Sequence, residues 1–476
     1  MTSSDPNPQS GFALLNELSD DEIGWLRKEG ERRFCDRGTV LVKEGARIEA
    51  LYMVLTGVIT VTVGGVGGRE IAKLGPGQII GEMSFLEDHP ASATVRAVEC
   101  SEVLALPRAK IESKLGEDPA FSSHWYRGLA IVASRRLRDS VGQLSRLLES
   151  EPMAENQALA RWGEVARRTQ EFKTRLVALS KSPRAAQTGN ELIEPLTDFS
   201  ATLDRAIGPD SLETLDARES LGARVQRELL PFFLKACTPL QLYEKPRGYP
   251  ADFRAVEMIH AHKPDGEGAL GPLLDEAFLA LPSMAAIRSS RKLIQDALRQ
   301  VVDSSATKPV RITSVGAAPA VELRGIAAAR PSDVEGTLLE FDDEALDWVR
   351  TIRGGARLRL ELESLVNLAL GFRRVDVDGQ DFVYSLLVSS FSDRFAVGVL
   401  NYLHGLLRPG GWACIGSLHP RNPDKSFFAH VLGWDIVHRD EDAMNNLFER
   451  SAFGRKCARF TSEEKSIFYL AACQKS

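Results

Sequence analysis

The pattern of apolar and polar positions near the start of the chain is typical of short β-strands. Runs of β-branched residues at 38–42 and 58–63 are interrupted by glycine, and Gly57 and residues 75–77 suit the turns between such strands. An amphipathic stretch around residues 15–28 precedes them and predicts one short helix. Short strands punctuated in this way predict an antiparallel barrel or jelly roll.

From about residue 120 to residue 235 the period of the apolar positions becomes helical. These positions form two groups, Leu129, Val132, Leu137, Val141, Leu144 and Leu148, and then Trp162, Val165, Thr169, Phe172, Leu176 and Leu179. Each group predicts an amphipathic helix. Residues 181–190, which include Pro183 and Gly189, predict a loop or hinge.

In the last third of the chain, strand-like and helix-like patterns alternate. Residues 311–315 form an apolar run that leads into a turn at Gly316 and then a helical pattern, and residues 336–340 form a second run that ends in an acid. In a dinucleotide-type fold the glycine lets the backbone approach a ligand, and the acid binds ribose hydroxyls. The candidate cofactor-binding residues of this region are Gly316, Ala317, Ala318 and Glu340.

Later segments continue this alternation in the order that such a sheet requires. Residues 382–386 predict a fourth strand, and residues 399–406 predict a helix. Residues 407–411, Leu-Arg-Pro-Gly-Gly, predict a turn that leads into a fifth strand ending near Gly416.

Length, charge and cysteine content narrow the class of protein. A chain of 476 residues is too long for one compact core, so we expect two or three domains. The net charge of −6 gives no reason to expect a nucleic-acid partner. No apolar run is long enough to span a bilayer, and the polar start does not predict a signal peptide, so we expect a cytoplasmic protein. The six scattered cysteines predict free thiols rather than a metal site or disulfides.

Two stretches of the first domain resemble the phosphate-binding cassette of cyclic-nucleotide-binding domains. They are residues 77–86, Gly-Gln-Ile-Ile-Gly-Glu-Met-Ser-Phe-Leu, and residues 90–97, and the resemblance covers about the first 150 residues. It implies that a short helix after a glycine turn presents N–H groups to an anion. It also implies that a glutamate, Glu82, accepts a hydrogen bond from a ribose hydroxyl. The implied pocket residues are Gly81, Glu82, Met83, Ser84, Ser92, Ala93 and Thr94.

One position departs from this family pattern. Ala91 stands where the family has the arginine that pairs with the cyclic phosphate. Losing that charge-assisted contact would weaken the binding free energy of a cyclic nucleotide by about 1.5–3 kcal/mol. Arg96 is a poor substitute, because strand alternation need not point it at the pocket. The domain is therefore either a cAMP or cGMP sensor or a structural module with another ligand or none. Its long following helix resembles one that often pairs two subunits, so we expect a homodimer; packing on its own barrel is the alternative.

The later series of strand, acid, strand and Pro-Gly-Gly turn resembles class I S-adenosylmethionine-dependent methyltransferases. The resemblance implies a Rossmann-like fold that binds S-adenosylmethionine. This cofactor has no phosphate, so alanines in the first turn are tolerable, whereas the pyrophosphate of a nicotinamide cofactor requires more glycines. Another Rossmann-like enzyme is the alternative.

Further motifs are similar to one family that joins these two domain types. Residues 245–253, Lys-Pro-Arg-Gly-Tyr-Pro-Ala-Asp-Phe, and residues 419–423, His-Pro-Arg-Asn-Pro, with residues 434–439 beyond, resemble extracellular-factor 3-hydroxypalmitic acid methyl ester biosynthesis proteins. The resemblance covers nearly the whole chain. It implies methyl transfer to the carboxylate of a hydroxy fatty acid.

A carboxylate acceptor is already a nucleophile at neutral pH, so it has to be oriented rather than deprotonated. Arg247, Arg288 and Arg291 are candidates to orient it, although each could instead form a salt bridge on a helix face. His419 follows the fifth strand and could position the acceptor, or act as a base on a hydroxyl or amine. Its alternative role is to cap the turn at Pro420.

Four further residues could lie near the expected cofactor, and each has a structural role as an alternative or as the expectation. Tyr249 and Asp252 could cap the cofactor, or could belong to a turn that packs on the core. Asp342 and Asp343 are expected to be solvated residues at a helix start, where the helix dipole favours negative charge.

Together these features predict a multidomain α+β and α/β protein with a jelly-roll domain at 12–150, a helical connector at 151–214, a helical lid at 215–305 and a methyltransferase core at 306–476. We expect a methyltransferase for a small acidic acceptor, with the first domain regulatory or dimerising. A non-catalytic sensor or scaffold with degraded pockets is the alternative, and a protein acceptor is a third possibility.

Overall fold

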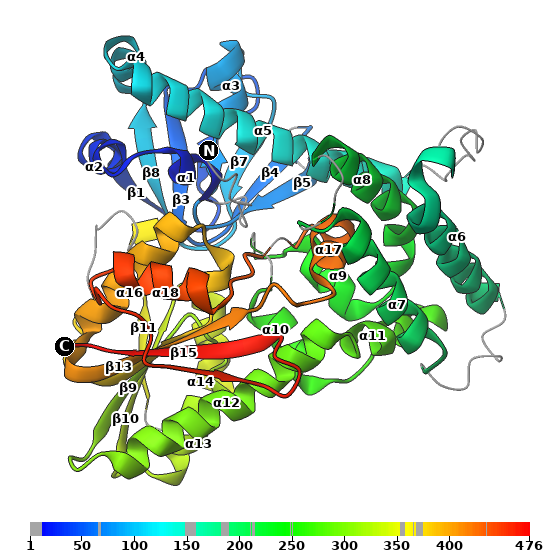
Figure 1. The fold of residues 1–476 in the computed structure, drawn as a ribbon. Helices are drawn as coiled ribbons and strands as arrows, with labels where there is room; N and C mark the ends of the chain where they lie inside the picture. The colour runs from blue at the N-terminus through cyan, green and yellow to red at the C-terminus, as the bar shows by residue number, and fades with distance from the viewer. Residues whose placement is uncertain are drawn as a thin grey trace.

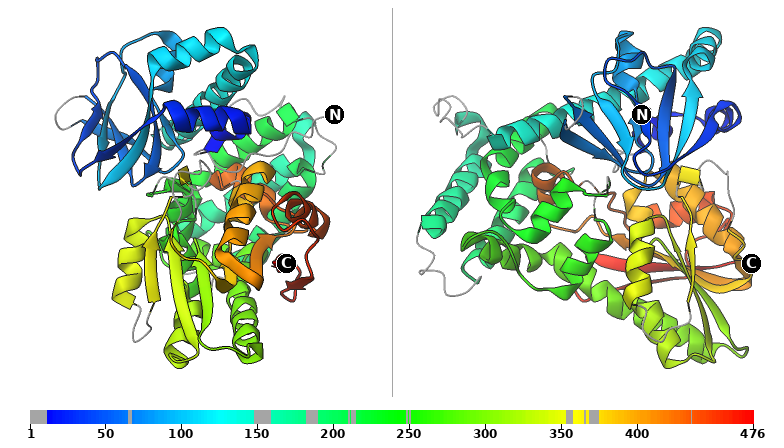
Figure 2. Two further views of the ribbon diagram at one scale, coloured as in Figure 1. Left: turned by 90° about the vertical axis from the view of Figure 1, so that its left-hand side faces the viewer. Right: turned by 180° about the vertical axis from the view of Figure 1, so that it is seen from behind.

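The computed structural model describes residues 12–64, 68–147, 159–181, 190–209, 211, 215–247, 249, 251–352, 358–364, 366–367, 375–434 and 436–476. Within them the chain forms an N-terminal domain, a cluster of helices and a C-terminal sheet flanked by helices (Figure 1). The N-terminal domain lies against one end of the C-terminal sheet, and the helical cluster lies beside both (Figures 1 and 2).

The N-terminal domain contains two antiparallel four-stranded sheets, ordered β1-β8-β3-β6 and β2-β7-β4-β5. This arrangement confirms the predicted antiparallel jelly roll. Its strands are β1 (Glu31–Cys35), β2 (Val40–Val42), β3 (Ala50–Thr56), β4 (Ile59–Val63), β5 (Arg69–Leu74), β6 (Ile79–Ile80), β7 (Thr94–Ala97) and β8 (Ser101–Pro107). Its helices are α1 (Ala13–Glu17), α2 (Asp20–Glu29), α3 (Glu82–Glu87), α4 (Arg108–Glu117) and α5 (Pro119–Leu147).

The single helix predicted around residues 15–28 is wrong, because α1 and α2 are separate helices. Ser19 between them has extended backbone and accepts a hydrogen bond from the Glu22 amide, while the Glu22 carboxylate accepts one from the Ser19 amide. This reciprocal capping box begins a new helix and so ends the preceding one.

The C-terminal domain is built on a seven-stranded sheet with the order β11-β10-β9-β12-β13-β15-β14. β9 to β13 pair in parallel, whereas β15 is antiparallel to both β13 and β14. The strands are β9 (Val310–Val315), β10 (Val334–Glu340), β11 (Leu358–Leu362), β12 (Gln380–Ser385), β13 (Leu407–Leu418), β14 (Arg459–Ser462) and β15 (Phe468–Gln474). β9, β10 and β12 lie at the positions that the sequence predicts.

The predicted turn at residues 407–411 is instead the first part of β13. Pairing of β12 with β13 shifts register between Gln380 and Phe382, so the Pro-Gly-Gly residues form an irregularity at the strand start. Gly410 has a φ of 79°, which glycine adopts at little cost.

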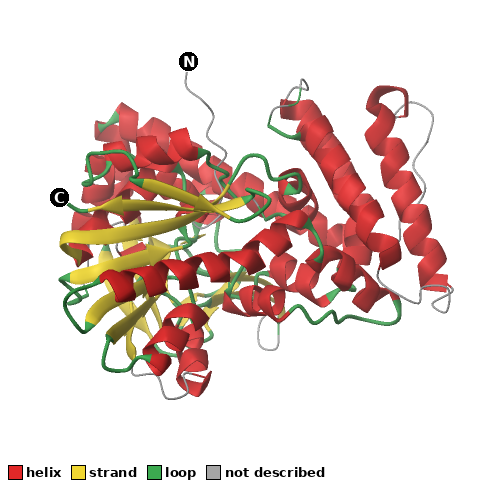
Figure 3. Cartoon of the chain, turned by 60° about the horizontal axis from the view of Figure 1, so that its bottom comes forward, coloured by secondary structure: helices red, strands yellow, loops and turns green. Residues whose placement is uncertain are grey.

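Helices cover both faces of this sheet (Figure 3). Apolar side chains of α12, α13 and α14 pack on one face, and those of α16 and α18 pack on the other. The helices of this domain are α10 (Phe253–Ala261), α12 (Pro282–Ser304), α13 (Val321–Ala329), α14 (Asp343–Ile352), α16 (Asp393–Leu406) and α18 (Glu441–Arg450), with a short 3₁₀ helix, η3 (Val388–Ser390).

The remaining helices form one apolar cluster, to which both the predicted connector and the predicted lid contribute residues. Phe172 on α6 stacks on both Phe199 of α7 and Phe233 of α8. The Phe233 ring also contacts the edge of Phe427 on α17. The helices are α6 (Leu159–Lys181), α7 (Asn190–Ile207), α8 (Leu215–Phe233), α9 (Cys237–Glu244), α11 (Leu270–Leu279) and α17 (Lys425–Leu432).

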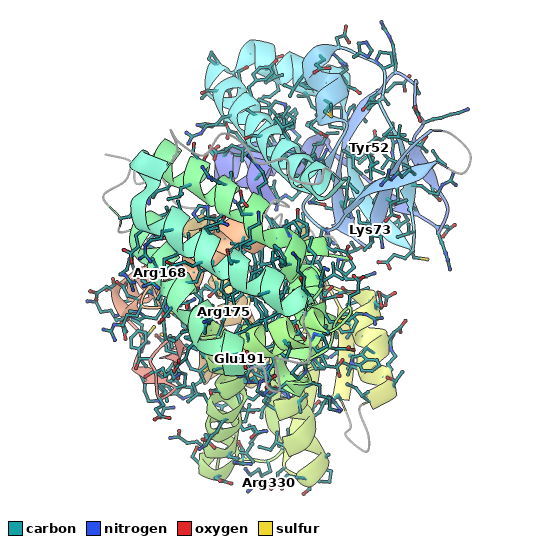
Figure 4. The ribbon with its side chains drawn as sticks, turned by 90° about the vertical axis from the view of Figure 1, so that its right-hand side faces the viewer. Tyr52, Lys73, Arg168, Arg175, Glu191 and Arg330 are labelled. Carbon is teal, nitrogen blue, oxygen red and sulfur yellow. The ribbon has the colours of Figure 1, made fainter. Side chains whose placement is uncertain are left out.

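Figure 4 views this cluster from the side, with Arg168 and Arg175 on α6 and Glu191 on α7. Most of the loop predicted at residues 181–190 lies outside the described residues, and so does Leu148 of the predicted long helix. No single described helix is by itself long and apolar enough to cross a membrane; α11 and α12 pass that test only as a pair, bent by 58°.

The N-terminal domain and the C-terminal sheet share an apolar core. The Phe12 ring lies 5.3 Å from the ring centres of both Phe391 and Phe395. Ser392 donates a hydrogen bond to the Asn16 side chain at 2.6 Å, and Arg394 pairs with Asp20 at 2.6 Å. The two domains are therefore in direct and partly apolar contact.

Candidate functional site

The cassette of the N-terminal domain is formed by a glycine turn and the short helix α3. Gly81 has a φ of 95°, a conformation that favours glycine, and the next residue, Glu82, is only 2% exposed. Arg136 on α5 pairs with the Glu82 carboxylate and also donates to the carbonyl of Ile79. The glutamate expected to bind a ribose hydroxyl therefore has a cationic partner from the long helix.

The other predicted cassette residues lie in α3 or in the segment that leads into β7. Ala91 is buried, and its backbone bonds with residues 45 and 46 of the neighbouring loop. The Thr94 hydroxyl accepts a hydrogen bond from the Glu44 amide at 3.1 Å, and Arg96 donates to the Gly38 carbonyl at 2.8 Å. The Arg96 guanidinium is thus bonded to the loop before β2. Ser84 and Ala93 are buried, whereas Met83 and Ser92 are exposed.

The second candidate site begins at the turn after β9. Gly316 has a φ of 59°, and its amide donates to the Leu339 carbonyl at 2.8 Å. A Cβ atom at this position would lie 2.1 Å from a Leu387 methyl and 2.6 Å from the Phe341 ring. Only glycine fits the backbone conformation and the close approach at this turn.

Glu340 at the end of β10 faces the same turn. Its Oε2 accepts a hydrogen bond from the Ala318 amide at 3.0 Å, and its Oε1 accepts one from the Phe341 amide at 3.0 Å. The residue is 3% exposed. Burial raises the pKa of Glu340 to about 7, although the two amides and the nearby Asp342 also act on it.

Asp342 is a member of this site that the sequence analysis missed, because the prediction that it is solvated is wrong. It is buried, and its carboxylate accepts hydrogen bonds from the Glu344 amide and, at 2.6 Å, from the Tyr249 hydroxyl. Arg247 also donates to it, at 2.7 and 2.9 Å. An acid at a helix start ordinarily indicates a solvated cap, so sequence alone gave no signal of these partners. Asp343 is exposed, as predicted.

Tyr249 and Asp252, predicted together as cofactor caps, have different surroundings. The Tyr249 ring packs against Phe341 with centres 5.8 Å apart, directly beside Glu340. Asp252 instead begins α10, where it accepts hydrogen bonds from the Ala255 amide and the Gln241 side chain. Tyr249 remains a candidate for the cofactor site, whereas the contacts of Asp252 fit the turn alternative.

The two arginines on α12 also differ. Arg291 lies 3.3 Å from the carboxylate of Glu322 on α13. Arg288, one turn earlier, is half-buried and donates to the Leu279 carbonyl at 2.7 Å; it forms no salt bridge with a carboxylate in the described part of the chain. Burial and then the charges of Arg291 and Arg288 lower the pKa of the neighbouring His260 to about 3. Arg288 is therefore a partly desolvated cation beside a neutral histidine.

His419 has partners for both ring nitrogens. Its Nδ1 accepts a hydrogen bond from the Arg421 amide at 3.0 Å, which leaves the proton on Nε2, 3.4 Å from the Glu441 carboxylate. This arrangement fits the alternative in which the ring caps the turn, and a role on the acceptor stays a prediction.

The residues that follow His419, from 422 to 425, connect the end of β13 to helices α12 and α7. Ser283 at the start of α12 donates to Asn422 at 2.7 Å and, from its amide, to Asp424 at 2.8 Å. Lys425 pairs with Asp204 on α7 at 2.5 Å. The motif is therefore an anchor between the helical cluster and the end of β13.

Comparison with known proteins identifies the first of these sites. Residues 32–118 match the family model of the cyclic nucleotide-binding domain. The Cyclic AMP receptor protein of Thermus thermophilus is 32% identical over 139 residues, which make up 29% of this chain and 62% of that protein. The chain thus spans less than two thirds of this relative.

Two solved structures are also similar. The Catabolite Activator Protein of Thermus thermophilus has 28% identity and a TM-score of 0.25, over 36% of this chain and 73% of that one. A possible exported protein from Bordetella parapertussis has 16% identity and a TM-score of 0.39, over 68% of this chain and 99% of that one. The family match and the antiparallel sheets together establish that the N-terminal domain is a cyclic nucleotide-binding domain.

Proposed function

We propose that the C-terminal domain is an S-adenosylmethionine-dependent methyltransferase for a small acidic acceptor, and that the N-terminal domain regulates or dimerises it. The main support is the pairing of the Gly316 turn with Glu340 at the carboxyl ends of adjacent strands. The strand order β11-β10-β9-β12-β13 is the doubly wound order, in which ligands bind at this edge where the order reverses.

The residues at this edge fit the cofactor that the methyltransferase resemblance implies. The Glu340 carboxylate would accept hydrogen bonds from ribose hydroxyls, and the turn at Gly316 would let the backbone approach the ligand. Tyr249 and Phe341 would border the same site. When bound, S-adenosylmethionine would supply an electrophilic methyl group on a sulfonium sulfur.

The acceptor requires orientation by protein side chains. A carboxylate oxygen forms the new bond to the methyl carbon as the carbon–sulfur bond breaks, and the bonding electrons remain on sulfur, so no proton is transferred. Arg288 is the better of the two α12 candidates to hold this carboxylate, because Glu322 already engages Arg291. The family resemblance favours a hydroxy fatty acid as the acceptor.

Two measurements test this proposal. Calorimetric titration with S-adenosylhomocysteine tests the cofactor site, and transfer of labelled methyl from S-adenosylmethionine to 3-hydroxy fatty acids tests the acceptor. Arg288→Ala should raise the KM for a fatty acid more than Arg291→Ala does, because Arg288 forms no ion pair with a carboxylate among the described residues. Equal effects of the two variants would contradict the assignment of Arg288.

Dimerisation through the N-terminal domain has its own support. Leu137 on α5 is 65% exposed, and Met83 on α3 is 50% exposed. A second copy of the chain that packs along α5 would cover Leu137. Light scattering on the wild type and a Leu137→Glu variant tests this: a dimer that dissociates in the variant supports it, and a monomeric wild type contradicts it.

A non-catalytic scaffold is the second candidate, and the state of Glu340 favours it. Both carboxylate oxygens are already bonded to backbone amides, and little of the residue is exposed. A folded wild-type protein that binds neither S-adenosylhomocysteine nor S-adenosylmethionine would support this reading.

A further inference from the structure

The N-terminal domain touches the C-terminal domain where the parallel strands end. The carbonyl of Leu55 in β3 accepts a hydrogen bond from Ser364, which follows β11. Phe12 packs on Phe391, which follows β12 and η3. Glu99, in the loop between β7 and β8, pairs with Arg247, which binds Asp342 just after β10. The domain therefore contacts the edge of the sheet at which the proposed donor site lies (Figure 2).

Arg247 lies between carboxylates from the two domains. On the N-terminal side, Nη1 and Nη2 donate to the two oxygens of Glu99, both at 2.8 Å. On the C-terminal side, Nε and Nη2 donate to the two oxygens of Asp342, at 2.9 and 2.7 Å. Planar two-point contacts of this kind fix orientation as well as supplying energy. Glu344 lies 3.1 Å from Nη1 as a third carboxylate, from the same domain as Asp342.

This ion pair is shielded from water on its C-terminal side. The side chain of Arg247 is 9% exposed and that of Asp342 is 2% exposed, while that of Glu99 is 28% exposed. Burial alone would lower the pKa of Arg247, but the hydrogen bonds that it donates to Glu99 and Asp342 raise that pKa above its ordinary value. The pair is therefore screened less than a surface salt bridge would be.

Glu99 is also held firmly by its own domain. The Ser101 hydroxyl donates to the Glu99 carbonyl at 3.0 Å, and the adjacent Val98 amide donates to the Val58 carbonyl at 3.0 Å. The loop directly follows β7, whose Thr94 belongs to the cyclic-nucleotide cassette. A displacement of the cassette or of β7 would therefore move the carboxylate that holds Arg247.

We propose that Glu99 is a positioning residue of the donor site, supplied by the N-terminal domain, and that the Glu99–Arg247–Asp342 chain transmits the state of that domain to donor binding. The proposal rests on the proposed methyltransferase function. Asp342 links Arg247 to the donor site, because it accepts a hydrogen bond from the Tyr249 hydroxyl and caps the start of α14 beside Glu340. Any ligand that changes the cassette then changes donor affinity by the same free energy with which the donor changes that ligand's affinity.

Glu99→Gln in the full-length protein tests this chain directly, because it removes the charge and keeps the shape. The dissociation rate of S-adenosylhomocysteine, followed by stopped flow, should rise about threefold to tenfold with little change in melting temperature. Glu99→Asp, which keeps the charge and shortens the reach, is a second variant with the same expected direction. An unchanged dissociation rate in both variants would overturn the proposal.

Two matched controls distinguish the Glu99–Arg247 contact from a general loss of charge on Arg247 and from a general loss of contact between the domains. Glu344→Gln removes a carboxylate from the same arginine without touching the N-terminal domain, and Asp20→Asn removes another ion pair between the domains, the one with Arg394. Each should change the dissociation rate by less than about twofold, since both carboxylates are exposed. An effect of Glu344→Gln equal to that of Glu99→Gln would show that charge on Arg247 matters and the domain link does not.

Hydrogen exchange without any cofactor distinguishes failure of this inference from failure of the proposed function. Glu99→Gln should accelerate amide exchange in the first turn of α14, which Asp342 caps, whereas the Asp20→Asn control should not. If the wild type does not bind S-adenosylhomocysteine, the proposed function fails, and the exchange result still decides whether the link exists. Unchanged exchange in Glu99→Gln would overturn the link.

Discussion

Each of the two domains places a buried glutamate where a ribose is expected, but the two carboxylates have different hydrogen-bond partners. Glu82 in the cassette has a cationic partner, Arg136, from the long helix α5. Glu340 at the end of β10 accepts hydrogen bonds from the amides of Ala318 and Phe341 and forms no ion pair in the part of the chain that the structure describes, and burial raises its pKa to about 7. A ligand of the first site therefore competes with an internal arginine, whereas a ligand of the second site needs a carboxylate that has lost its proton.

This difference teaches that a shared residue type does not imply a shared state. In the cassette, the negative charge of Glu82 is balanced by the positive charge of Arg136. Ligand binding there should therefore depend on how readily Arg136 moves away from Glu82. The proposed donor site holds a carboxylate that contacts no cation within the described residues, since Arg247 is directed to Asp342 and Glu99. Its occupancy should depend on pH.

The largest expected effect separates the two glutamates by ligand. Glu340→Ala should weaken S-adenosylhomocysteine binding about 100-fold or more, because hydrogen bonds from two ribose hydroxyls to a charged acceptor are lost. Glu82→Ala should weaken that affinity by less than about tenfold, because the residue lies in the other domain and reaches the proposed donor site only through the Glu99–Arg247–Asp342 chain. Calorimetry on the two variants measures both, and equal losses would contradict the assignment of separate sites.

Ala91→Arg sharpens the comparison from the side of the cassette. It restores the cation that the family resemblance expects beside a cyclic phosphate, so cAMP or cGMP affinity should rise about tenfold to 100-fold. Ala91→Lys is the matched control, with a smaller gain because an ammonium cannot bind two phosphate oxygens in one plane. If neither variant gains affinity, another feature closes the pocket.

Removing Arg136 tests the internal partner of Glu82. Arg136→Ala leaves a buried carboxylate without its cation and should destabilise the N-terminal domain by about 1–2 kcal/mol, a value reduced because the Arg136 side chain is 32% exposed. Hydrogen exchange in α3 measures it. Arg136→Lys should recover part of the loss, and an unchanged exchange rate in Arg136→Ala would contradict the pairing.

The smallest effect is the pH dependence of the donor site. Because the folded protein holds the pKa of Glu340 at about 7, the ionised acceptor becomes more abundant as pH rises, and S-adenosylhomocysteine affinity should increase about tenfold from pH 6 to pH 8. The same raised pKa means that this group's contribution to stability, present below its ordinary 4.5, is lost as pH rises through 7. Glu340→Gln should flatten both profiles, and a flat profile in the wild type would contradict the shift.

Much of the fold follows from sequence periodicity, because glycine-punctuated β-branched runs and alternating strand and helix patterns are local signals. The break at Ser19 was missed because a capping box interrupts a helix without changing its apolar spacing. The cassette residues and the Gly316–Glu340 pair were predictable, since each follows directly from a strand or turn. Asp342, Glu99 and Arg136 were not, because their roles arise from contacts between distant segments that no local pattern encodes.

The measurement that tests the central claim most directly is calorimetric titration of the wild-type protein with S-adenosylhomocysteine at pH 8. We expect one site per chain with a micromolar dissociation constant, and we expect this binding to be lost in Glu340→Ala. No binding to a protein shown to be folded would contradict it and would favour the scaffold.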